Sequence, residues 1–151
     1  MRSDGSVTWQ RQKGSLALVF PQHDLTHYAV ETTLGYRGAF YGLVADGWEI
    51  SDFAKPWPRG PIPVEAREVE MLVGLFDGMR RDRAARDSAE LNRQMQRLVD
   101  DSKFADAITP RVLTDADVAA VRQLRDSLLM QWAAVEPGDS LELEFRRGST
   151  R

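Results

Sequence analysis

The sequence predicts an α+β fold, in which a small antiparallel sheet of about three strands packs against four or so helices. Two short β-rich runs near the N-terminus, residues 7–12 and 15–20, are separated by Lys13-Gly14, and glycine readily adopts the positive φ of a hairpin turn. Residues 140–145 alternate apolar and acidic side chains, which is typical of a half-buried strand. Between these segments the apolar residues recur at helical spacing.

The first half of the chain predicts a hairpin followed by two helices. The run 15–20, SLALVF, is nearly all apolar and suits a strand that helices cover. We expect Pro21 to end this strand and a helix to follow over residues 23–34, with Gly35 as its C-terminal stop. A second helix is expected over 38–50, and the four prolines of residues 53–63 indicate a loop.

The second half predicts two further helices and the last strand. One helix should begin after Pro63, a favourable first-turn residue, and continue as a thin amphipathic helix over 64–104. Thr114, with Asp117 three residues later, has the pattern of a capping box and should begin the last helix. That helix is expected to end before the turn residues 137–139, Pro-Gly-Asp, which precede the strand.

Composition indicates a single globular domain, 1–151, and disfavours some classes of binding partner. The chain is 42% hydrophobic and 28% charged, with a net charge of −3. This acidic balance gives no support to binding of nucleic acid or of an anionic membrane, and no apolar run approaches the roughly eighteen residues of a membrane span. The first residues lack a signal-peptide core, so a cytoplasmic location is expected. Because cysteine is absent, any metal must be held by nitrogen and oxygen ligands.

Both histidines of the protein lie in HDLTHYAVE, residues 23–31. Positions i, i+4 and i+8 lie along one face of an α-helix, so His23, His27 and Glu31 should form a row. Two imidazoles at this spacing can bind one cation. Asp24 would be a further ligand or would orient an imidazole. The same spacing also occurs where two histidines are only hydrogen-bonded surface residues.

A second helix could complete such a site. If the two helices around TLGYRG pack antiparallel, His27 lies level with Asp46, and Glu31 lies level with Gly42. Asp46 is therefore the first candidate for a ligand from the second helix, and Glu49 is the next. The competing interpretation is that the glycines only permit close packing while both acids face solvent.

The stretch His23-Asp24-Leu25-Thr26-His27 is similar to the HDxxH motif of a ubiquinone-biosynthesis family that binds zinc through this motif and a downstream glutamate. Gly38 falls where that family has the glycine before its glutamate, and Ala39 occupies the place of the glutamate itself. The resemblance covers roughly 20 of 151 residues and implies that zinc is the metal. The HDLxHxxVE opening also resembles that of a bacterial group of proteins, which implies no particular activity.

Two hypotheses of function follow. In the first, a divalent cation, zinc above all, activates water in a hydrolase or lyase that acts on a small molecule, with Glu31 or Asp24 as the catalytic general base. The expected ligands are His23, His27 and one or two of Glu31, Asp46 and Asp24. In the second, the histidines are structural, and the polar helix 64–104 with the last helix forms a surface for a partner or a homodimer.

Overall fold

The computed structural model describes residues 1–2, 4–81 and 87–146. In this part of the chain the regular structure is entirely helical. Its elements are α1 (Leu16–Leu34), α2 (Phe40–Ala45), the 3-10 helix η1 (Ile50–Phe53), α3 (Val64–Arg81), α4 (Ser88–Asp100) and α5 (Asp115–Ala133). Because the described residues contain no strand, the predicted α+β class and its three-stranded sheet are wrong.

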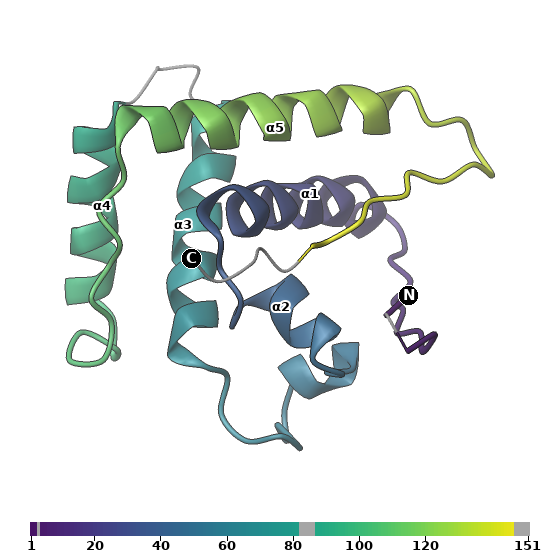
Figure 1. Ribbon diagram of the computed structural model, residues 1–151, viewed down its shortest axis with the longest axis horizontal. Coiled ribbons are helices and arrows are strands. Elements are labelled where there is room, and N and C mark those ends of the chain that lie inside the picture. The colour runs from purple at the N-terminus through teal and green to yellow at the C-terminus, as the bar shows by residue number, and fades with distance from the viewer. Residues whose placement is uncertain (3, 82–86, 147–151) are drawn as a thin grey trace.

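The longer helices form two pairs that cross each other, α1 with α5 and α3 with α4. Helices α1 and α5 lie side by side and run in opposite directions, and α3 runs across them (Figure 1). Helix α4 packs against α3 on the side away from α2, while α2 packs against α1. Since α1 contacts α2, α3 and α5, it is the central helix of the fold.

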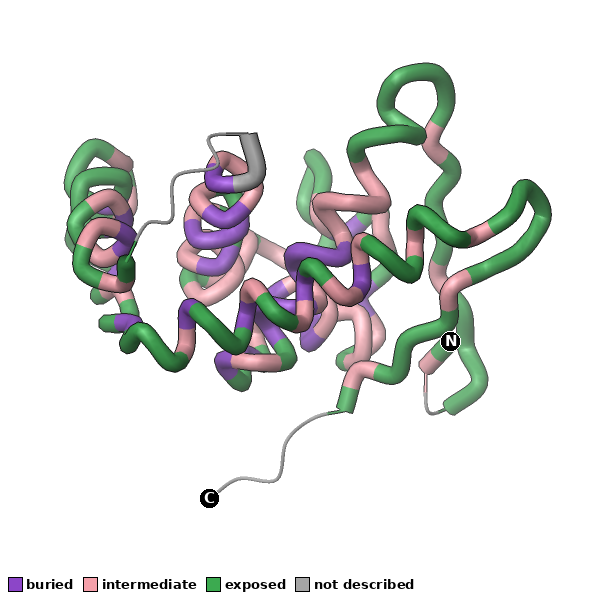
Figure 2. Tube along the Cα trace, turned by 90° about the horizontal axis from the view of Figure 1, so that it is seen from above, coloured by how far each residue is buried: buried purple, intermediate pink, exposed green. Residues whose placement is uncertain are grey.

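The core lies where the helices face one another, as the buried positions in Figure 2 show. On α3 the side chains of Val69, Val73 and Phe76 are fully buried, and their i, i+4, i+7 spacing places them along one face. Helix α4 buries Leu91, Met95 and Val99 with the same periodicity. The burial of these apolar stripes is the main force that holds the pairs together, because each buried side chain contributes about 1.5–3 kcal/mol.

The two segments predicted as an N-terminal hairpin adopt other structures. Residues 7–12 form no regular element, and the Trp9 side chain is 76% exposed. Residues 16–20 instead belong to the start of α1, with Pro21 inside the helix. Leu16, Leu18 and Val19 are largely exposed there, so the apolar run is not a buried strand. A short apolar run cannot by itself distinguish a strand from a helix, and leucine and alanine favour a helix.

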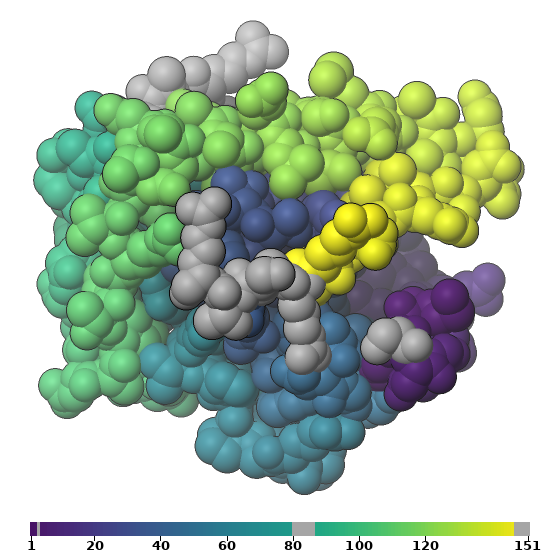
Figure 3. All heavy atoms as spheres, in the orientation of Figure 1, coloured from purple at the N-terminus to yellow at the C-terminus, as the bar shows by residue number. Residues whose placement is uncertain are grey.

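The predicted C-terminal strand is an extended segment without a strand partner among the described residues. Phe145 stacks on Tyr41 with ring centroids 5.7 Å apart, and the Tyr28 hydroxyl donates to the backbone oxygen of Glu144 at 2.8 Å. Leu141 packs against the core. In Figure 3 the segment, coloured yellow, lies over α1 beside α5. Leu141 and Phe145 of the alternating pattern therefore pack on helices, and no sheet forms among the described residues.

Local signals for the ends of helices agree with the structure better than the strand patterns do. Gly35 ends α1 in the left-handed conformation with φ of 74°, and Thr114 and Asp117 form the expected capping box of α5. The helix predicted over 38–50 is shorter, because α2 ends at Ala45. The helix predicted over 64–104 is divided between α3 and α4, and its residues 82–86 lie outside the described chain. None of the described helices is both long and apolar enough to cross a membrane.

Candidate metal centre

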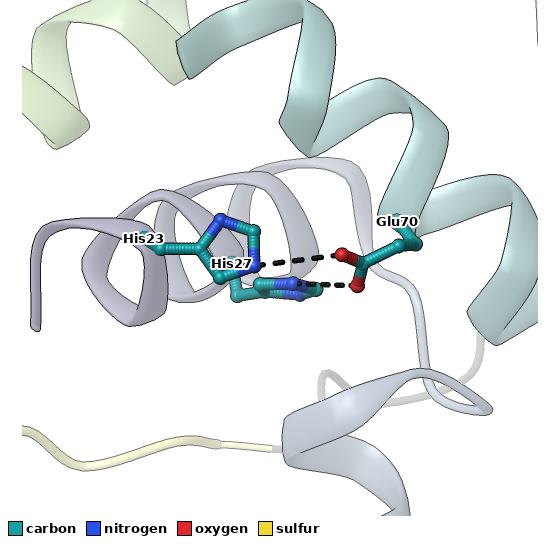
Figure 4. A group of neighbouring side chains, drawn as sticks. All are labelled: His23, His27 and Glu70. Atoms are coloured by element: carbon teal, nitrogen blue, oxygen red, sulfur yellow. Dashed lines mark hydrogen bonds and ion pairs between the residues drawn. The ribbon is translucent and has the colours of Figure 1, made fainter. Parts of the chain in front are cut away.

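Helices α1 and α3 bring His23 and His27 together with Glu70 (Figure 4). The Nε2 atom of His27 lies 3.1 Å from Oε2 of Glu70, and Nε2 of His23 lies 3.5 Å from Oε1. Zinc bonds of about 2.0–2.1 Å in tetrahedral geometry separate neighbouring ligand atoms by roughly 3.3 Å. One ligand atom from each of the three residues lies within 4.8 Å of the others, so this group could hold a metal ion.

The other nitrogen of each imidazole contacts a second carboxylate. Nδ1 of His23 lies 2.9 Å from Oδ2 of Asp77, and Nδ1 of His27 lies 3.2 Å from Oε1 of Glu31. With the proton on Nδ1, each ring donates to the carboxylate behind it and presents the Nε2 lone pair toward Glu70. Metal-binding histidines are held in this way, by an acceptor that fixes both the tautomer and the ring orientation.

The two outer carboxylates are themselves fixed by the fold. The hydroxyl of Thr26 donates to Oδ1 of Asp77 at 2.7 Å. Glu31 is fully buried, and its Oε2 accepts the backbone N–H of Tyr41 at 2.9 Å and of Gly42 at 3.4 Å. These N–H groups belong to the first turn of α2, which has no partner for them within the helix. The rings are therefore positioned by a second layer of contacts that involves three helices.

The electrostatics of the group reflect three carboxylates around two imidazoles. Hydrogen bonds to Asp77 and then Glu70 raise the pKa of His23 to about 10. Burial opposes the charged form of His27, but its hydrogen bonds to Glu31 and Glu70 raise its pKa overall. The hydrogen bonds from His23 and His27 hold the pKa of Glu70 well below its usual range. This surplus of acidic groups favours a cation, either as protons on the imidazoles or as a metal that replaces them.

A cavity of about 610 Å³ lies beside the cluster. His23, His27 and Glu70 contribute to its wall, together with Asp24 and a set of mostly apolar side chains. Burial raises the pKa of Asp24. Its carboxylate accepts no hydrogen bond from the part of the chain that the structure describes, although its backbone oxygen accepts one from Tyr41. A carboxylate beside the metal-ligand group is thus free to interact with a bound molecule.

The residues predicted from the sequence occupy different places around this site. His23 and His27 are brought together, and Glu31 contacts Nδ1 of His27 on the side away from Glu70. Asp46 lies at the C-terminal end of α2, outside the cluster and the cavity wall. The predicted register required two long antiparallel helices, and α2 has only six residues. Glu31 does meet Gly42, but the level match of His27 with Asp46 does not place that acid in the cluster.

The residues that sequence reasoning missed are Glu70 and Asp77. Seven residues apart, they share one face of α3 and both approach α1. Their spacing on a predicted helix was the available signal. Nothing local in the sequence indicates that this face, and not the face of another helix, packs against the histidines.

Comparisons with known proteins assign no family to the chain. No family model matches the sequence, and no match is found among curated proteins or solved structures. The resemblance of the HDLTH stretch to a zinc-binding motif therefore stays a prediction. The geometry of the site is what indicates a function for this chain.

Proposed function

We propose that the protein binds a divalent metal ion, zinc above all, through His23, His27 and Glu70, and acts as a metal-dependent hydrolase or lyase on a small molecule. The observation that most supports this is the orientation of the two imidazoles. Both Nε2 atoms converge on one carboxylate, while both Nδ1 atoms contact other carboxylates. Three protein ligands leave one tetrahedral position open, as in catalytic zinc sites.

The cavity beside the proposed metal has room for a water molecule and a substrate. A bound divalent cation lowers the pKa of a coordinated water toward neutrality, which supplies a nucleophile at ordinary pH. Asp24 lies in the same wall and would accept the proton of such a water. The apolar remainder of the wall binds the substrate and limits the access of bulk water. Glu31 and Asp77 orient the imidazoles and do not touch the substrate.

The alternative is that the same side chains form only an ion-pair network between α1 and α3. Protonated imidazoles between carboxylates would satisfy the geometry without a metal. The position of Glu70 favours the metal, because its side chain is 62% exposed and lies beside the cavity, where an ion pair contributes little to stability. The two interpretations differ in a measurable way, since only the first requires stoichiometric metal binding.

Titration of chelator-treated protein with zinc, followed by isothermal calorimetry, tests the site. We expect one zinc per chain in the wild type. Glu70→Gln should abolish tight binding, because the amide is a poor zinc ligand. Asp46→Asn is the matched control, an acid-to-amide change outside the cluster, and should bind zinc normally. Less than about a tenth of a metal per chain in the wild type, unchanged by added zinc, would overturn the proposal.

Two further variants separate binding from chemistry and from folding. His27→Ala should also lose zinc, and circular dichroism shows whether the variant remains folded. If His27→Ala unfolds, Glu70→Gln still tests metal binding, because the Glu70 side chain is exposed and contributes little to the core. Asp24→Asn should keep zinc and lose zinc-dependent turnover of esters and amides. Turnover that is unchanged in Asp24→Asn would remove this residue from the mechanism.

A further inference from the structure

Arg67 lies in the wall of the same cavity, one helical turn before Glu70 on α3. Its Nε atom is buried and has no hydrogen-bond partner. Its guanidinium carbon lies 4.9 Å from the ring centroid of Phe104. No carboxylate of the described residues forms an ion pair with it. A buried donor of a charged group without an acceptor is costly, and a partner that is not part of the chain, such as a water, an ion or a ligand, would satisfy it.

The rest of the wall indicates what this partner is. Arg67 is the only arginine or lysine among the described residues that line the cavity. The wall also contains four phenylalanine rings, Phe20, Phe40, Phe53 and Phe104. A volume of about 610 Å³ lies within the usual range for small-molecule sites. The cavity therefore combines one fixed positive charge with a large apolar surface.

We propose that the substrate is a small carboxylate with an apolar body, whose carboxylate binds Arg67 while the apolar body packs on the phenylalanine rings. This inference rests on the proposed function, because it names the substrate class of that site. A planar guanidinium matches a carboxylate through two parallel N–H···O bonds, and the ring of Phe104 holds that plane. Asp24 and Glu70 in the same wall disfavour a second negative charge, so a carboxylate fits better than a phosphate dianion.

The test compares hydrocinnamate with its neutral analogue hydrocinnamamide on zinc-loaded protein, with binding measured by calorimetry. The wild type should bind the acid at least about 10-fold more tightly than the amide. Arg67→Met should weaken binding of the acid by about 10- to 100-fold and remove the preference. Arg93→Met, an exposed arginine of α4, is the matched control and should leave both affinities unchanged.

The methionine variant is chosen because it keeps an unbranched apolar side chain over Phe104 and removes an unpaired donor. Its stability should equal or exceed that of the wild type, so a loss of acid binding does not reflect unfolding. The variant also keeps all three proposed metal ligands. A decrease in affinity therefore separates binding at Arg67 from coordination of the acid to zinc.

Four results would overturn the inference. The first three are equal affinity for acid and amide, an acid affinity that Arg67→Met leaves unchanged, and no saturable acid binding by the wild type up to about 10 mM. Tighter binding of inorganic phosphate than of the acid would also overturn it. Zinc content is measured on every sample. Zinc binding without an acid preference refutes only the substrate class, whereas an Arg67-dependent preference without zinc binding refutes only the metal site.

Discussion

Replacement of Glu31 by glutamine tests how the site is joined to the fold. The side chain is fully buried, and its two oxygens face three N–H groups, from His27, Tyr41 and Gly42. A carboxylate offers only acceptors, which matches three donors. Glutamine offers one oxygen and one NH2 group, so as long as Nδ1 of His27 carries a proton, at least one donor of the protein must face another donor. Rotation of the amide changes only which donor is left unpaired, and all groups are satisfied only if His27 moves its proton from Nδ1 to Nε2, the nitrogen that faces Glu70.

The size of the effect follows from that mismatch. A buried donor without an acceptor costs about 1–3 kcal/mol, and in a domain of this size each kcal/mol lowers Tm by about 2–4 °C. We therefore expect Glu31→Gln to lower the free energy of unfolding by about 1–3 kcal/mol, measured by urea denaturation with a chelator present. Zinc affinity should fall by about 10- to 100-fold, because the orientation of His27 is lost.

Glu68→Gln is the matched control for this substitution. A single oxygen of Glu68, Oε1, accepts both the hydroxyl of Tyr36 and the backbone N–H of Arg111, each at 2.9 Å. The oxygen of a glutamine can accept both, so the cost should stay below about 1 kcal/mol. If Glu31→Gln costs no more than Glu68→Gln, then the count of donors around Glu31 does not govern its contribution and the reasoning is refuted.

Three further predictions concern the core, a helix cap and the pH dependence of stability. Phe76 is fully buried on α3, so Phe76→Ala should lower the free energy of unfolding by about 3–5 kcal/mol in urea denaturation; a loss below about 1 kcal/mol would mean that this part of the core is loosely packed. Thr114→Ala removes the side chain that accepts the N–H of Asp117 and should cost about 1 kcal/mol, while Thr114→Ser should be neutral; equal stabilities of the two variants would exclude a role for the cap. In metal-free protein, the raised pKa of His23, about 10, gives a contribution to stability that is complete below pH 6.5 and is lost as the pH rises toward 10. The lowered pKa of Glu70 gives a contribution that is small, because this side chain is exposed to solvent, and that is present above pH 4.5 and lost on acidification. The unfolding free energy should therefore decrease between pH 6.5 and 10, and an equally steep decrease in His23→Gln would contradict this origin.

The sequence predicted the end of one helix and the start of another, where a local signal determines them. The glycine at position 35 and the capping pair Thr114 and Asp117 act within one turn of the chain, so their effects can be read without tertiary structure. Strands need a partner to satisfy their backbone groups, and that partner lies elsewhere in the chain. The apolar run 15–20 and the alternating run 140–145 each fit a strand locally, but no described segment pairs with them. The apolar run is instead continuous with the helix that was predicted to begin at residue 23.

The same difference between local and tertiary signals applies to the residues of the site. The i, i+4 spacing correctly placed His23 and His27 on one face of a helix. Glu31 follows on that face, and the structure places it behind the imidazole of His27. Glu70 comes from a different helix, and its approach depends on how the apolar faces of α1 and α3 pack. Helix register across a tertiary interface is set by side-chain shape on both partners, which one sequence pattern does not reveal.

The order of residues along α3 connects the two proposals. Asp77 contacts His23, Glu70 contacts both histidines, and Arg67 follows one turn further toward the N-terminus of the helix. The axial rise over three residues is about 4.5 Å, so the proposed anion-binding group lies roughly one turn from the carboxylate proposed to bind the metal. A substrate of the proposed class that reaches both would have its carboxylate separated from the reacting bond by only a few bonds. Helix α3 is held rigidly, because Val69, Val73 and Phe76 are fully buried. This rigidity fixes the separation of the two groups, so the helix would determine which substrate lengths fit the proposed site.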